Sequence, residues 1–215
     1  RTRGKGDWVY GKLLVRAKLP AGKPGIWPAI WMMPTDQKYG SWPNSGEIDV
    51  MENVGWAPGV IHNSVHTGAF NHRLRSHKHA EVVVDDAHSA FHVYGVEWDE
   101  DAIRYSIDGR QTFEFLNTKT GNPAEWPFSQ RFHLILNVAV GGNWGAARGL
   151  DDTCLPTCME VDYVRFYQRG TDITDAPPPP RASPLARVRE CERADVRRAV
   201  KLSARTHARP RLPAR

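Results

Sequence analysis

Three acidic side chains stand close together in the first third of the chain and are the strongest candidates for chemistry. Glu47, Asp49 and Glu52 fall within six residues, and the residues between them are apolar. A retaining glycosidase needs two carboxyl groups about 5–5.5 Å apart, one as the nucleophile and one as the acid/base. A third carboxylate between them can hydrogen-bond one partner and hold the two pKa values apart. The triplet therefore indicates hydrolysis of a glycosidic bond, with a row of solvent-facing acids on an edge strand as the alternative.

The spacing of the triplet requires an irregular strand. In a regular strand Glu47 and Asp49 share one face, whereas Glu52 points to the other. A β-bulge at Val50-Met51 adds one residue to the strand and restores the phase. We therefore predict a bulge that places all three carboxyl groups on one surface.

Tryptophans surround the acidic triplet in the sequence. The chain has eight of them; Trp27 and Trp31 are four residues apart, Trp42 precedes the triplet, and Trp56 and Trp144 follow it. Indole rings combine a large apolar face with one N–H donor, and such faces pack well on the C–H surfaces of sugar rings. Any single tryptophan could equally belong to the core. As a group they predict an aromatic groove for a glycan, with Trp27, Trp31, Trp42 and Trp144 as its candidate substrate contacts.

The elements that position these side chains are predicted to be strands. Apolar residues alternate over much of the chain, most clearly in the runs 12–19, 59–66, 91–98, 132–140 and 159–163. Asp108-Gly109 separates two alternating stretches between residues 102 and 115, and this dipeptide favours a tight hairpin turn. Short strands separated by turns rich in Gly, Pro and Asn indicate an all-β sandwich or barrel.

The chain of 215 residues changes character after residue 168. Residues 1–168 suffice for one well-buried domain, and no apolar run approaches the roughly 18 residues of a membrane span. Pro177–Pro180 form a stiff spacer, followed by a segment poor in large apolar residues. We predict a domain over 1–168, and a Pro/Arg-rich linker and disordered tail over 169–215.

The net charge of +5 belongs to the tail: residues 169–215 carry 12 Lys/Arg and 5 Asp/Glu, whereas residues 1–168 carry 17 and 19. A basic tail can attach to nucleic acid, although a solvated appendage is the interpretation that we favour. The three cysteines, Cys154, Cys158 and Cys191, are too few for a metal site of their own. Cys154 and Cys158 could form a local disulfide or remain thiols.

Several runs together resemble glycoside hydrolase family 16, in particular its laminarinase-type members. The resemblance covers residues 4–168 in order, and the bulged Glu-x-Asp-x-x-Glu pattern is its most specific part. The runs that carry it are residues 26–34 (IWPAIWMMP), 45–55 (SGEIDVMENVG), 64–72 (SVHTGAFNH), 91–98 (FHVYGVEW), 136–144 (LNVAVGGNW) and 159–165 (MEVDYVR).

The resemblance implies a β-jelly-roll sandwich of two antiparallel sheets with a concave substrate groove, and retaining endo-hydrolysis of β-1,3-glucan. It assigns Glu47 as the nucleophile, Glu52 as the acid/base and Asp49 as the supporting carboxylate. His66 matches a family histidine near the acid/base, whereas the residues alone would make it a hydrogen-bonded core histidine.

The resemblance also implies features outside the catalytic strand. Asp162 matches a position that binds a structural calcium in some members, and catalysis itself is expected to need no cofactor. Further strands before Arg1, secretion to the extracellular space and a monomeric state are expected. The alternatives are a mixed-linkage glucan or a galactan as substrate, or a non-catalytic glucan-recognition protein. Recognition proteins on this fold lack the catalytic glutamates, whereas Glu47 and Glu52 are both present.

Overall fold

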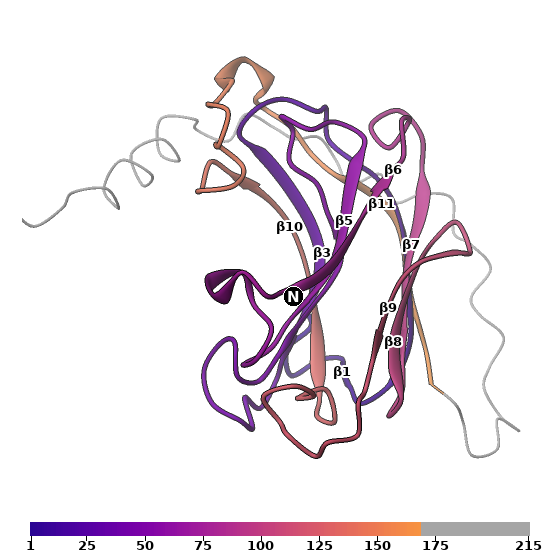
Figure 1. The fold of residues 1–215 in the computed structure, drawn as a ribbon. Helices are drawn as coiled ribbons and strands as arrows, with labels where there is room; N and C mark the ends of the chain where they lie inside the picture. Colours follow the sequence, from indigo (N-terminus) through magenta and orange to yellow (C-terminus); the bar gives the residue numbers. More distant parts are fainter. Residues whose placement is uncertain (169–215) are drawn as a thin grey trace, which may run out of the picture.

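The computed structural model describes residues 1–168, apart from the side chain of Cys154, and within them two antiparallel sheets lie face to face (Figure 1). In spatial order the first sheet contains β1 (Asp7–Trp8), β10 (Phe132–Val140), β3 (Ile26–Pro34), β4 (Glu47–Glu52), β5 (Val60–His66) and β6 (Lys78–Val83). The second contains β11 (Glu160–Tyr167), β2 (Gly11–Lys18), β7 (His92–Trp98), β8 (Ala102–Ile107) and β9 (Arg110–Leu116). Two short 3₁₀ helices, η1 (His72–Leu74) and η2 (Asp152–Cys154), lie in connections.

The core lies between the two sheets and is built from alternate residues of their strands. The second sheet contributes Leu13, Val15 and Ala17 from β2, and the first contributes Ile30 and Met32 from β3, all fully buried. Burying one such large aliphatic side chain stabilises the fold by about 1.5–3 kcal/mol. The predicted all-β jelly-roll sandwich of two antiparallel sheets is thus confirmed.

Local sequence signals account for most strands. Asp108 and Gly109 have φ of 51° and 80°, the left-handed conformations that a tight turn between β8 and β9 requires. Two strands were not predicted. β1 has only two residues, and β6 carries exposed charged residues such as Lys78 and Glu81. Charged side chains are usual on edge strands, but they conceal the alternation by which a strand is recognised.

β11 forms one of the two edges of the second sheet in the described part of the chain. Val161, Val164 and Tyr167 on this strand are exposed. Cys158, just before β11, is exposed as well.

The predictions for the Pro-rich linker, the basic tail and Cys191 fall on residues 169–215, outside the described residues. None of the described helices is long and apolar enough to cross a membrane.

Candidate active site

Strand β4, which carries the three acids, contains the predicted bulge. On the β3 side, Met51 pairs with Ile30 and Asp49 pairs with Trp31, so Val50 has no partner of its own. On the β5 side, the register runs from Asp49↔Ser64 to Glu52↔His62, leaving two residues of β4 opposite one of β5. The bulge at Val50-Met51 is therefore confirmed.

The bulge separates apolar from acidic side chains. Ile48, Val50 and Met51 are fully buried in the core between the sheets. Glu47 and Glu52, at the two ends of β4, remain partly exposed. The acids thus lie on the outer face of the first sheet, which is the side that faces away from the second sheet.

Asn63 is the β5 residue opposite the bulge, and it satisfies the backbone there. Its side-chain Nδ2 donates to the carbonyl oxygen of Val50 at 2.7 Å. Its Oδ1 accepts from Thr112 Oγ1 of β9 at 2.7 Å, and Asn63 is fully buried. A carbonyl that a bulge frees from the ladder must find another donor, so Asn63 holds the bend from the core side.

We expect Asn63→Ala to impair both stability and catalysis. An unsatisfied buried carbonyl costs about 1–3 kcal/mol, and a shift of about 1 Å at a reacting group can cost about 100-fold in rate. Thermal unfolding and steady-state kinetics should show a lower Tm and a kcat reduced at least about tenfold, with a smaller change in KM. Thr112→Val, which leaves the bond to Val50 in place, serves as the milder comparison. A lower Tm with an unchanged kcat would limit Asn63 to a purely structural role.

Glu47 and Asp49 form a carboxyl pair at the centre of the site. Glu47 Oε2 accepts from Trp42 Nε1 at 2.5 Å. Burial raises the pKa of Glu47 above its usual value, and hydrogen bonds from Asp49 and Trp42 oppose this shift only in part. Asp49 is 1% exposed, and its Oδ2 accepts from Ser64 Oγ at 2.8 Å.

The hydrogen bond between Glu47 and Asp49 favours the proton on Asp49. Burial, followed by the charges of Glu47 and Glu52, raises the pKa of Asp49 well above its usual range. In the hydrogen bond that joins the pair, the protonated Asp49 donates to Glu47, which favours the ionised form of Glu47. An ionised carboxylate backed by a neutral acid is suited to act as a nucleophile.

Glu52 has the properties of a proton donor. Burial, followed by the charge of Glu47, raises its pKa to about 7, although a hydrogen bond from Trp27 Nε1 at 3.0 Å to Oε1 opposes this shift. From the sequence, Asp49 was expected to hydrogen-bond one of the two glutamates and to hold their pKa values apart. The structure favours proton sharing with Glu47, and the charge that acts on Glu52 is that of Glu47.

His66, which was expected near the acid/base Glu52, lies beside Asp49 instead. The β5 residue that pairs with Glu52 is His62. His66 pairs with Glu47 across β4 and β5, it is 7% exposed, and its Nε2 lies 3.5 Å from Asp49 Oδ2. Burial, followed by neighbouring histidines, lowers the pKa of His66 to about 4. The imidazole is therefore neutral at neutral pH.

The neighbouring histidines were missed in the sequence. His66 stacks on His77, and His77 stacks on His79, with ring centroids 5.5 and 4.4 Å apart. His72 of η1 contacts both His66 and Trp42. His77 and His79 are two residues apart, a spacing that places two side chains on the same face of a strand. This spacing is informative only if β6 is known to be a strand.

The four tryptophans predicted as substrate contacts all lie at the site and are partly buried. Trp27 donates to Glu52, Trp42 donates to Glu47, and Trp31 Nε1 donates to Asn137 Oδ1 at 2.7 Å. Trp144 packs edge-on against Trp27 with ring centroids 5.2 Å apart. Two of the four indoles, those of Trp27 and Trp42, therefore contact the glutamates directly. The role of all four as sugar platforms stays a prediction.

Asp162 lies on β11 of the second sheet, away from the acids. Its Oδ2 accepts from Arg16 Nη1 at 2.6 Å, so an arginine already compensates its charge. Among the described residues, no group of three metal-ligating side chains includes Asp162. These residues alone do not fit a calcium ion, which takes six to eight oxygen ligands.

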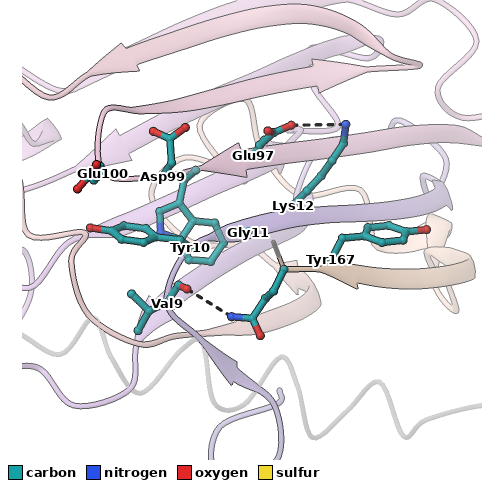
Figure 2. A pocket seen from close by; sticks show the side chains of 10 residues that line it. Val9, Tyr10, Gly11, Lys12, Glu97, Asp99, Glu100 and Tyr167 are labelled. Carbon is teal, nitrogen blue, oxygen red and sulfur yellow. Dashed lines mark hydrogen bonds and ion pairs between the residues drawn. The ribbon is translucent and has the colours of Figure 1, made fainter. Parts of the chain in front are cut away.

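A separate hollow of about 570 Å³ lies where β2, β7 and β11 meet, lined by residues that include Tyr10, Glu97 and Tyr167 (Figure 2). Two of its three acids, Glu97 and Asp99, already have partners. Glu97 lies 3.5 Å from Lys12, and Asp99 accepts from Arg104 and from backbone amides. This hollow therefore offers no carboxyl pair comparable to that on β4.

Several glucanases are similar to this chain in sequence and structure. A beta-glucanase from Rhodothermus marinus is 47% identical over 173 residues, covering 78% of this chain and 60% of that protein. The crystal structure of the laminarinase from Rhodothermus marinus superposes with a TM-score of 0.75 at 46% identity, covering 78% of this chain and 68% of that one. The crystal structure of SCLam, a non-specific endo-β-1,3(4)-glucanase, superposes with a TM-score of 0.73 at 47% identity. The match covers 78% of this chain and 61% of that one.

This chain thus spans roughly 60% of the length of the beta-glucanase that it matches. The sequence model described as "Glycosyl hydrolases family 16" matches residues 1–165, which include the bulged strand and every residue of the site. The chain belongs to glycosyl hydrolases family 16.

Proposed function

We propose that this chain catalyses retaining endo-hydrolysis of β-1,3-glucan through a covalent glycosyl-enzyme intermediate. The observation that carries the proposal is the bulge in β4, which puts Glu47 and Glu52 on one face of the sheet. Glu47, backed by the protonated Asp49, supplies the nucleophile. Glu52, with a pKa raised to about 7, supplies the proton.

In the first step a Glu47 oxygen attacks the anomeric carbon while Glu52 gives its proton to the departing glycosidic oxygen. Glu47 thereby becomes a glycosyl ester, and the charge that raised the pKa of Glu52 is removed. Glu52 can then act as a base: it takes a proton from water, which attacks the anomeric carbon and releases Glu47. Two inversions give a product with the configuration of the substrate.

The choice of β-1,3-glucan rests on the names of the similar proteins, which include a laminarinase. Mixed-linkage β-glucan is the second candidate, because SCLam is named as a non-specific endo-β-1,3(4)-glucanase. A galactan remains the more distant alternative. A purely recognising role is disfavoured, since it would require neither Glu47 nor Glu52.

The test is incubation of the chain with laminarin and with lichenan, with product sizes and the first-formed anomer followed by chromatography and proton NMR. We expect oligosaccharides of mixed length from laminarin, released first as the β-anomer. Cleavage of lichenan alone would reassign the linkage, and initial release of the α-anomer would reject the retaining mechanism. Binding of laminarin without cleavage would favour the recognition protein.

The alkaline limit of activity should report the protonation of Glu52. Activity requires the protonated form, so the rate is expected to fall as the pH rises through about 7. The Trp27 N–H stabilises the ionised form of Glu52. Trp27→Phe removes this donor, which raises the pKa of Glu52 and should move the alkaline limb of kcat/KM to higher pH.

Trp31→Phe is the matched control, because the Trp31 indole donates to Asn137 and not to a carboxylate. Both variants also change the aromatic surface and can therefore change the absolute rate. The readout is the pH at which the alkaline limb of kcat/KM falls. A limb that moves to lower pH in Trp27→Phe would contradict the assignment of Glu52 as the acid.

A further inference from the structure

One group of side chains at the site has a composition that the glycosidase mechanism does not require. Glu47, Asp49 and His66 each present a potential ligand atom, and these atoms all lie within 4.8 Å of one another. The group combines two carboxyl groups with an imidazole nitrogen, and a bound cation would displace the proton that Asp49 and Glu47 share. Retaining hydrolysis needs the carboxyl groups, but it assigns no step to an imidazole nitrogen.

His66 is the buried imidazole of this group. It is 7% exposed, its Nε2 lies 3.5 Å from Asp49 Oδ2, and its Nδ1 has no hydrogen-bond partner among the described residues. Two ligands bound about 2.1 Å from a tetrahedral ion lie about 3.4 Å apart. The separation of His66 and Asp49 therefore already matches that of two ligands of one metal.

We propose that Zn²⁺ binds between Glu47, Asp49 and His66, and that the bound ion switches the enzyme off. One nitrogen and two oxygens with a fourth position open to solvent form a usual zinc ligand set. Asp49 and His66 close the buried side, and the partly exposed Glu47 leaves the outer side open. Calcium fits poorly, because it takes six to eight oxygen ligands.

Inhibition follows from the identity of one ligand, and this part of the inference rests on the proposed function. A Glu47 carboxylate bound to Zn²⁺ cannot attack an anomeric carbon, because its lone pair and its charge are committed to the ion. The ion also occupies the space beside Glu47 that the sugar must enter. Zn²⁺ and glucan are therefore expected to compete.

The binding test is isothermal titration calorimetry of ZnCl₂ into the full chain at pH 7 in a non-chelating buffer. We expect one zinc ion per site, with an affinity at least tenfold weaker in both His66→Gln and Asp49→Asn. His79→Gln is the matched control: His79 is exposed and stacks on His77, but it lies outside the ligand group, so the affinity should stay within twofold. CaCl₂ should give no comparable binding.

Histidines and cysteines elsewhere in the chain are unchanged in all three variants, so binding at them would persist in each. A zinc affinity that His66→Gln and Asp49→Asn leave within twofold would overturn the proposal. So would an equal loss in His79→Gln. If a substitution disturbs folding, as a lowered Tm would reveal, the anomalous zinc signal in crystals of the unmodified chain decides, because it must lie between the three side chains.

The inhibition test measures laminarin hydrolysis with added ZnCl₂ and after chelation with EDTA. We expect competitive inhibition that EDTA reverses, and full activity with zinc bound would overturn the inhibitory role. Calorimetry needs no hydrolysis, so the two proposals fail separately. A chain that binds zinc at this site but never cleaves glucan would uphold the site and reject the proposed function.

Discussion

Glu47→Ala is expected to abolish hydrolysis of every β-glucan, with kcat reduced by at least about 10⁴-fold, the size of loss seen when a covalent nucleophile is removed. Without the carboxylate no glycosyl-enzyme ester can form. A better leaving group cannot compensate, because the missing bond is the one to the enzyme. The variant should therefore be equally inactive on laminarin and on an activated aryl β-glucoside.

The control for Glu47→Ala is Glu97→Ala. Glu97 lies on β7 of the second sheet, partly exposed and 3.5 Å from Lys12, and surface ion pairs of this kind contribute at most about 1 kcal/mol. Its kinetics should match those of the unmodified chain. If Glu47→Ala keeps more than a small fraction of its laminarin activity, the catalytic interpretation of β4 is wrong.

The bulge could be predicted because chemistry and burial make opposite demands on six residues. Ile48, Val50 and Met51 belong to the core, and both glutamates must reach one surface. Only an added residue in the strand satisfies both demands. The partner that holds the bulge, Asn63, could not be predicted, because its bond to Val50 depends on the register between β4 and β5.

The hydrogen bonds of the tryptophans could not be predicted from the sequence either. Their abundance predicted an aromatic surface, but Trp27 and Trp42 prove to donate to the two glutamates. A distance of 25 residues separates Trp27 from Glu52, and their contact depends on the pairing of β3 with β4. Residue type indicates what a side chain can do, whereas its partner is set by the tertiary fold.

The histidines show a different failure of sequence reasoning. His77 and His79 lie on or next to β6, an edge strand whose exposed charges concealed its alternation. Because β6 was not predicted to be a strand, the spacing of two residues between His77 and His79 did not indicate that they lie on the same face. The pairing of β6 with β5 is what brings His77 onto His66 and His79 onto His77.

Glu52→Ala is expected to separate the two steps of the reaction. Laminarin has an alkoxide leaving group that needs a proton, so its hydrolysis should fall by about 10²–10⁴-fold, the usual contribution of general acid catalysis. An aryl β-glucoside with an acidic phenol needs no such proton. Its first step should stay fast, giving a burst of phenol as the Glu47 ester accumulates, because water then lacks its general base.

Azide should relieve this second block in Glu52→Ala. The anion attacks the anomeric carbon of the glycosyl ester without losing a proton, the ester bond breaks, and the Glu47 carboxylate departs. Two inversions make the product a β-glycosyl azide, so NMR of the product tests the roles directly. An α-glycosyl azide would mean direct displacement without an intermediate. If azide instead rescues Glu47→Ala to a β-azide and leaves Glu52→Ala inactive, the nucleophile and the acid/base must be exchanged between the two ends of β4.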